Sequence, residues 1–162
     1  MIIPSIHASC VAYGKYGVLI RGPSGSGKSD LVLRLLDQQG FGIGNKLLRA
    51  KLVADDQVIL RLEKGGLIAS APAALKGKLE IRGHGMVEVA CISKIKLVCV
   101  VDLVPMSDIE RLPQSHDLEI TMDGIKLAYL KLWSASPSAP ARLRSYLQET
   151  VAKSFSNKAK TR

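Results

Sequence analysis

Residues 22–29, GPSGSGKS, have the types and spacing that bind phosphate groups. Gly22, Gly27, Lys28 and Ser29 fit the pattern G-x-x-x-x-G-K-[ST]. In such a loop the backbone N–H groups point at phosphate oxygens, and the following helix adds partial positive charge. The lysine neutralises the β- and γ-phosphates, and the hydroxyl coordinates Mg²⁺. The loop therefore predicts a site for ATP and magnesium, and the alternative is a glycine-rich turn that caps an ordinary helix.

The whole loop is expected to surround the phosphates, with contacts from Gly22, Pro23, Ser24, Gly25, Ser26, Gly27, Lys28 and Ser29. The loop does not specify the reaction, because ATPases, GTPases and kinases all use it. The sequence contains no NKxD-like segment that would read guanine, which disfavours a GTPase. A phosphoryl transferase also needs a group that orients or deprotonates the acceptor, and a second contact to the metal or to the phosphates.

Two consecutive carboxylates, Asp55 and Asp56, follow the apolar segment 51–54. Consecutive residues of an extended chain point to opposite sides. One carboxylate can therefore face a metal or phosphate while the other faces an acceptor hydroxyl and acts as its base. The alternative is an aspartate-rich turn that opens the hairpin after it.

Other charged residues could support the same chemistry. Glu80 and Arg82, in LEIRGHG, are predicted on one side of a strand, where Glu80 could hold a metal and Arg82 could meet phosphate. The alternative for this pair is an exposed ion pair on a sheet face. Arg111, in IERLP, and His7, before the loop, are single polar residues with no functional pattern of their own.

These residues must be positioned by a strand-rich α/β domain. Strands are expected over residues 6–13, 16–21, 51–54, 57–62, 67–71, 79–83 and 96–104, with two more around the turn Asp123–Gly124, and helices over residues 29–39 and 139–152. A strand, a glycine-rich loop and a helix in that order are the context that a phosphate-binding loop requires. We expect one domain over residues 1–152 and a basic, disordered tail over residues 153–162.

Composition excludes several classes of protein. The chain has 162 residues and a formal charge of +9, but residues 153–162 carry four of the positive charges. No platform of aromatic and basic residues accompanies the charge, which disfavours nucleic-acid binding. No apolar run approaches the roughly 20 residues of a membrane span, and the first residues do not resemble a secretory signal. The three cysteines lack CxxC spacing and fit thiols in a reducing cytoplasm.

These features, in this order, resemble the catalytic domain of the HPr kinase/phosphorylase family. These bacterial enzymes phosphorylate a serine of the phosphocarrier protein HPr and can reverse the reaction with phosphate. The resemblance covers residues 5–150 and is strongest in the first 90 residues. Its most specific elements are His7, the loop GPSGSGKS, VADD at residues 53–56 and LEIRGHGM at residues 79–86.

The resemblance implies a fold and a set of partners. The fold is an α/β P-loop nucleotide-binding domain of the HPr kinase and phosphoenolpyruvate carboxykinase-like type, strand-rich with few helices. The activity is ATP-dependent, Mg²⁺-requiring phosphorylation of a serine on an HPr-like phosphocarrier protein. The family also implies a homo-oligomer, specifically a hexamer.

The resemblance also assigns roles to single residues. Lys28 is implied as the phosphate-binding catalytic lysine, and Ser29 and Glu80 as the magnesium ligands. Asp56 is implied as the base that accepts the proton of the substrate serine. The remaining implied catalytic residues are His7, Arg82 and, through the weaker match of ERLP to a DRLG-like motif, Arg111.

The chain departs from the family pattern in three ways. The chain begins almost at His7, so we expect a short form without the family's N-terminal domain. The family segment close to PVRPGRN, tied to phosphorolysis, is replaced by SASPSAPAR at residues 134–142, so we expect weak or absent phosphorolysis. Pro23, Asp30 and His84 replace the usual Asp, Glu and Leu.

Two other functions stay open from the sequence. One is a P-loop kinase or ATPase with a different acceptor, and the other is a nucleotide sensor without catalysis. The presence of both Asp56 and Glu80 favours chemistry, because a sensor needs only the phosphate loop.

Overall fold

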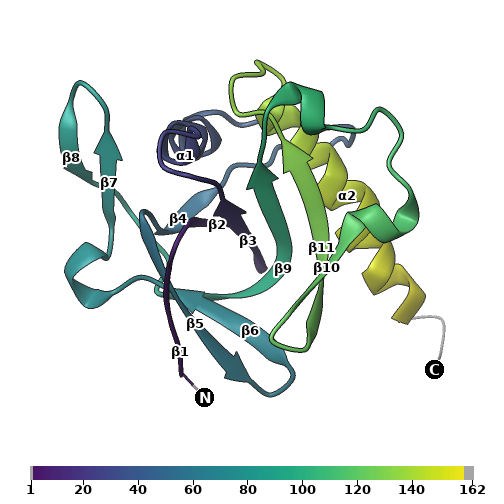
Figure 1. Cartoon of the computed structure of the whole chain (residues 1–162), viewed down its shortest axis with the longest axis horizontal. Coiled ribbons are helices and arrows are strands. Elements are labelled where there is room, and N and C mark those ends of the chain that lie inside the picture. The colour runs from purple at the N-terminus through teal and green to yellow at the C-terminus, as the bar shows by residue number, and fades with distance from the viewer. Residues whose placement is uncertain (1, 159–162) are drawn as a thin grey trace.

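A computed structural model describes residues 2–158 of the chain. Its longest strand, β9 (Lys94–Leu103), belongs to two sheets. The first residues of β9 pair antiparallel with β6 (Gly66–Ser70). The rest of β9 pairs parallel with β3 (Tyr16–Arg21) on one side and with β11 (Ile125–Leu132) on the other. The strand therefore joins two sheets that lie in different layers (Figure 1).

The remaining strands extend these two sheets. One sheet continues from β6 to β5 (Gln57–Glu63) and β1 (Ile2–His7). The other continues from β3 to β2 (Ser9–Tyr13) and β4 (Lys51–Ala54), and from β11 to β10 (Glu119–Met122). A separate hairpin of β7 (Lys78–Ile81) and β8 (Gly85–Glu88) stands beside the first helix (Figure 1).

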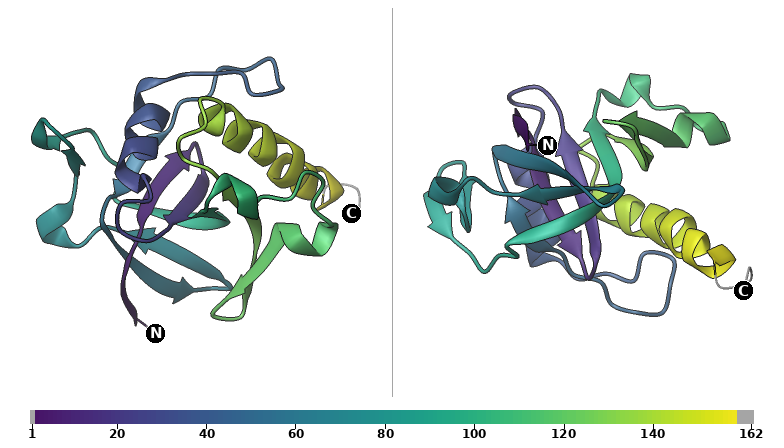
Figure 2. Two further views of the ribbon diagram at one scale, coloured as in Figure 1. Left: turned by 45° about the horizontal axis from the view of Figure 1, so that its top comes forward. Right: turned by 90° about the horizontal axis from the view of Figure 1, so that it is seen from below.

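Two α-helices, α1 (Lys28–Asp37) and α2 (Ala139–Lys158), cover one face of the sheet that contains β3 (Figure 2). Alternate residues of β3 face opposite sides of this sheet. Val18 and Ile20 pack in the same core as helix residues such as Leu31 and Leu143, whereas Leu19 packs in a second core between the two sheets. The short 3₁₀ helices η1 (Ala73–Leu75), η2 (Met106–Asp108) and η3 (Ser115–Leu118) lie in connecting loops.

The structure corrects one predicted strand. Residues 6–13 form two strands rather than one, because β1 ends at His7 and pairs with β5, whereas β2 begins at Ser9 and pairs with β3 and β4. At Ala8 the chain passes from one sheet to the other, and its N–H donates a 3.2 Å hydrogen bond to the Asp56 carbonyl oxygen. This change of sheet places His7 directly beside Asp56.

Other differences concern the later elements. Strand β8 was not expected, and β7 ends at Ile81, so that Arg82 lies in the β7–β8 turn rather than on a strand. Helix α2 runs to Lys158 instead of Ala152. The disordered tail expected over residues 153–162 falls on the end of this helix and on residues outside the described part.

The cysteines are free thiols, with Cys10 and Cys99 buried and Cys91 half-buried. Within residues 2–158, none of the helices combines the length and the hydropathy that a membrane crossing requires.

Candidate active site

The phosphate loop connects the end of β3 to the start of α1. Gly25 and Gly27 have φ angles of +80° and +93°, in the region that residues with a side chain rarely adopt. A Cβ at Gly27 would also lie 2.5 Å from the Ser134 Oγ. Because Gly27 is the N-cap, no side chain caps the start of α1. The first turn therefore presents backbone N–H groups and partial positive charge to a ligand.

Lys28 folds back over this loop and is 7% exposed. Its Nζ donates hydrogen bonds of 2.6 Å to the Gly22 carbonyl oxygen and 3.0 Å to that of Pro23. Burial lowers the pKa of Lys28, while the carboxylates of Asp56 and Asp55 raise it. A phosphate group in the loop would supply further negative charge and so offset the cost of burying the ammonium.

The half-buried Ser29 and the buried Asp55 form the floor of the site. The Ser29 hydroxyl donates to both Asp55 carboxylate oxygens, at 3.1 and 3.0 Å. The Ser9 hydroxyl donates to the Asp55 Oδ1 at 2.7 Å. Ser9 is 0% and Asp55 4% exposed, so these hydrogen bonds compensate for the burial of the carboxylate.

Asp56 points away from this floor and is exposed. Its φ of +66° lies in the left-handed region, which aspartate tolerates better than most residues do. Its Oδ1 lies 3.2 Å from the His7 Nδ1, and its carbonyl oxygen lies 3.1 Å from the same nitrogen. The two aspartates therefore face different surroundings, as expected, but they lie in the bend between β4 and β5, and the left-handed backbone of Asp56 separates their side chains rather than the alternation of an extended strand.

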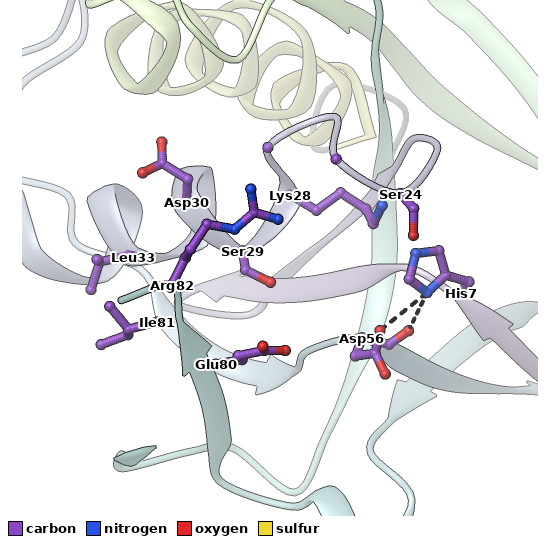
Figure 3. Close-up of a pocket in the computed structure, with 12 residues that line it drawn as sticks. His7, Ser24, Lys28, Ser29, Asp30, Leu33, Asp56, Glu80, Ile81 and Arg82 are labelled. Atoms are coloured by element: carbon purple, nitrogen blue, oxygen red, sulfur yellow. Dashed lines mark hydrogen bonds and ion pairs between the residues drawn. The ribbon is translucent and has the colours of Figure 1, made fainter. Parts of the chain in front are cut away.

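A cavity of about 430 Å³ joins these groups. Its lining includes His7, Ser24, Gly25, Gly27, Lys28, Ser29, Asp56, Glu80 and Arg82, all of which the sequence named as site residues. Figure 3 shows the Arg82 guanidinium directed toward the phosphate loop and the Glu80 carboxylate directed toward Asp56. The hairpin of β7 and β8 thus forms the wall opposite His7.

Four of the named residues do not line this cavity. Gly22, Pro23 and Ser26 belong to the loop itself, and the carbonyl oxygens of the first two hold Lys28. Arg111 lines a different cavity, together with Trp133 and Arg142. The structure therefore does not bring Arg111 to the phosphate loop.

The structure adds two residues, Asp55 and Ser9, to those predicted for the site. The sequence pairs Asp55 with Asp56 but predicts a site role for Asp56 alone. Ser9 has one usable signal, a hydroxyl within the largely apolar segment 8–13, since a buried hydroxyl needs a partner. Its contact with Asp55 depends on the pairing of β2 with β4, which no local pattern specifies.

The oxygen atoms at the floor suit a hard divalent cation. Mg²⁺ prefers one or two carboxylates together with waters and phosphate oxygens. Ser29 and Asp55 already lie within hydrogen-bond distance of each other, and Glu80 adds a second carboxylate at the cavity wall. The donors present therefore fit magnesium bound together with a nucleotide.

Together, the sheet, the loop and the helix define a P-loop nucleotide-binding domain of the α/β class. The chain belongs to a family described as the HPr serine kinase C-terminal domain, whose sequence model matches residues 3–161.

Individual relatives agree with this assignment. An HPr kinase/phosphorylase 1 of Oceanobacillus iheyensis is 32% identical over 160 residues, which cover 93% of this chain and 47% of the relative. An HPr kinase/phosphorylase of Clostridium tetani is 38% identical over 84 residues, which cover 52% of this chain and 24% of the relative. The chain thus spans about a quarter to a half of the length of these relatives.

A solved structure supports the fold. The Hpr(Ser) kinase/phosphatase from Coxiella burnetii superposes with a TM-score of 0.78 at 24% sequence identity. The match covers 98% of this chain and 96% of that one. The strand-rich α/β architecture with two long helices is therefore the fold of that structure.

Proposed function

We propose that this domain transfers the γ-phosphoryl group of ATP to a serine hydroxyl of an HPr-like phosphocarrier protein. The observation that carries the proposal is the meeting of Lys28, Ser29 and Asp56 in one cavity. The loop provides a phosphate site, and an exposed carboxylate stands across the cavity from it. Membership of the family, together with the names of the relatives, supports serine as the acceptor.

The residues divide the work between phosphate and acceptor. The loop N–H groups and the Lys28 ammonium bind the β- and γ-phosphates and stabilise the charge that shifts during transfer. Asp56 accepts the proton of the serine hydroxyl as its oxygen bonds to the γ-phosphorus and the bond to ADP breaks. Arg82 provides a further positive charge at the mouth of the cavity.

His7 and Asp55 act through other groups. The His7 Nδ1, 3.2 Å from the Asp56 carboxylate, restrains the orientation of the base. Asp55 orients the Ser29 hydroxyl from below. Bound Mg²⁺, held by Ser29, Asp55 and Glu80, would neutralise phosphate charge.

We also propose a cellular compartment and an oligomeric state for the domain. The free thiols fit a reducing compartment, so we place the domain in the cytoplasm. The family resemblance supports a homo-oligomer, a hexamer in the form that the resemblance implies.

The test is transfer of labelled γ-phosphate. The full chain is incubated with labelled ATP, Mg²⁺ and a panel of HPr-like carriers, and the same carriers with the target serine changed to alanine are the controls. Label on the serine-containing carrier alone supports the proposal. Release of free phosphate without a labelled carrier indicates an ATPase, and binding without turnover indicates a nucleotide sensor; either result overturns it.

A further inference from the structure

A second cavity, of about 320 Å³, lies at the ends of β9 and β11. It is lined by the apolar side chains of Met106, Ile109 and Trp133 and by the polar residues Glu110, Arg111, Ser136 and Arg142. A cavity of this volume that combines apolar and aromatic side chains with polar groups suits a small organic molecule. None of these residues lines the phosphate cavity.

This second cavity is joined to the phosphate loop by the segment after β11. The Ser134 hydroxyl donates a 2.6 Å hydrogen bond to the Ser26 carbonyl oxygen, inside the loop. Trp133, the neighbour of Ser134, lines the second cavity. Arg34 of α1 fixes the segment by donating to the carbonyl oxygens of Ser134 and Ser136, the latter at 3.3 Å. Trp133 is thus the neighbour in sequence of Ser134, the residue that contacts the phosphate loop.

The order of the strands gives the direction in which a bound nucleotide must run. Strands β3, β9 and β11 are parallel and adjacent, so their carboxyl ends meet at one edge of the sheet. Ligands of open α/β sheets bind at this edge. Asp55 and Asp56 follow β4, on the opposite side of β3 from β9. A nucleotide with its γ-phosphate toward Asp56 therefore directs its nucleoside toward β9 and β11.

We propose that the second cavity is the subsite for the purine nucleoside of the nucleotide whose phosphates occupy the loop. The base stacks on Trp133, whose side chain is 39% exposed and so offers an aromatic face. The Glu110 carboxylate accepts hydrogen bonds from the exocyclic amino group or the ribose hydroxyls. This inference rests on the proposed function, because it takes the loop as the phosphate site.

The first test uses the intrinsic fluorescence of Trp133, which is the only tryptophan of the chain. The full chain is titrated with ATP and with inorganic tripolyphosphate, both in the presence of Mg²⁺. Both ligands occupy the phosphate loop, but only ATP carries a base. Quenching by ATP and not by tripolyphosphate supports the subsite. Equal responses to the two ligands, or no response to bound ATP, overturn it.

The second test uses variants and calorimetry. Trp133→Ala is expected to weaken ATP binding about tenfold, in line with the loss of one stacked base, and to leave tripolyphosphate binding within about twofold. Trp133→Phe keeps an aromatic ring and is expected to retain most of the affinity. Phe41→Ala, which removes another exposed aromatic ring outside both cavities, is the matched control.

The outcomes separate this inference from the proposed function. If Trp133→Ala loses equal affinity for ATP and tripolyphosphate, or loses affinity for neither, the second cavity is not the nucleoside subsite. The proposal that the loop binds phosphate is unaffected by these results. If the native chain binds neither ligand, the phosphate site itself is wrong, and the subsite fails with it.

Discussion

The Ser9 hydroxyl donates a 2.7 Å hydrogen bond to the Asp55 Oδ1, and both side chains are buried. The same carboxylate accepts hydrogen bonds from Ser29, the second residue of α1. A hydrogen-bonded path therefore runs from the first residue of β2 to the start of the helix that follows the phosphate loop. This path compensates for the burial of the Asp55 carboxylate in the bend after β4, and it ties the orientation of Ser29 to a residue outside the loop.

Ser9→Ala is expected to lower the affinity for Mg²⁺ more than it lowers kcat. The change removes one of the hydrogen bonds that fix Asp55 and costs about 1–3 kcal/mol of stability. The KM for Mg²⁺ should rise about 10-fold, the lower end of the range for a residue that orients a metal ligand, with a smaller change in kcat. Direct Mn²⁺ binding in the presence of ADP, followed by electron paramagnetic resonance, should weaken in parallel.

Ser9→Thr, which keeps the hydroxyl, is the control for the Ser9 prediction. It should retain native metal affinity if the hydroxyl is what matters. A Ser9→Ala protein with lower stability but unchanged metal affinity would reduce Ser9 to a packing residue.

Lys28→Ala is expected to abolish transfer and to weaken ATP binding while the fold is kept. Burial lowers the pKa of Lys28, which means that the folded chain without ligand bears a cost for the charged ammonium. Removing the side chain relieves this cost but also removes its two hydrogen bonds to the loop carbonyl oxygens, so we expect the Tm to change little. Circular dichroism melting and labelled transfer measure the two effects on one preparation. Full transfer by a well-folded Lys28→Ala protein would show that phosphoryl transfer does not depend on the lysine of the phosphate loop.

Asp56→Asn is expected to lower transfer by about 10²-fold or more, as for a general base, with little change in ATP affinity. The substitution keeps size and hydrogen bonding but cannot accept the serine proton. Asp55→Asn is the matched control one residue earlier, and it should act through metal affinity instead. If Asp56→Asn kept the full rate while Asp55→Asn lost turnover without loss of metal binding, the base would be Asp55.

Local patterns predicted the parts of the site that are local in structure. The loop and the helix after it depend on neighbours in sequence, so the motif was enough. Asp55 and Asp56 do face different surroundings, but through a bend with a left-handed Asp56, which strand alternation does not describe. The break at Ala8 depends on which sheet each strand joins, and this is a tertiary choice. The β7–β8 turn was read as strand because Arg82 follows an alternating run, although Gly83 and Gly85, at φ +83° and +115°, permit the reversal.

The stability of the domain should depend on Tyr129 at high pH. The Tyr129 hydroxyl donates a 2.7 Å hydrogen bond to Asp102, which also pairs with Arg21, directly before the phosphate loop. Burial and this hydrogen bond raise the pKa of Tyr129 to about 12, from 10.0. Above pH 10 the unfolded chain loses this proton before the folded chain does, so the free energy of unfolding falls as the pH rises toward 12.

The comparison with Tyr129→Phe isolates this effect, since lysines titrate in the same range. Urea denaturation at several pH values between 9 and 12 should show a steeper fall for the native chain than for the variant. Parallel curves for the two proteins would show that the Tyr129 hydroxyl has the same pKa in both states.

Phosphorolysis should be much slower than phosphorylation, because the arginines available for it lie on helix α2 rather than on a loop. The reverse reaction holds a free phosphate in line with a phosphoserine, and each pair of unit charges at about 4 Å repels by a few kcal/mol at an effective dielectric near 20. Fixed positive groups must offset this repulsion, a task that the resemblance gives partly to a loop with two arginines. The nearest counterparts here are Arg142 and Arg144.

Both arginines belong to helix α2 rather than to a loop that could close over a phosphate, and Arg144 is buried whereas Arg142 is exposed. Arg144 is 4% exposed and donates to the Gln38 carbonyl oxygen, and Arg142 donates to the Ser138 hydroxyl at 2.8 Å and lines the second cavity. We therefore expect dephosphorylation of the phosphoserine carrier, at saturating phosphate, to proceed at less than about a tenth of the forward rate. Kinetics in both directions on one purified carrier measure the ratio. Equal rates would mean that other positive groups, such as Arg82 or Lys131, hold the incoming phosphate.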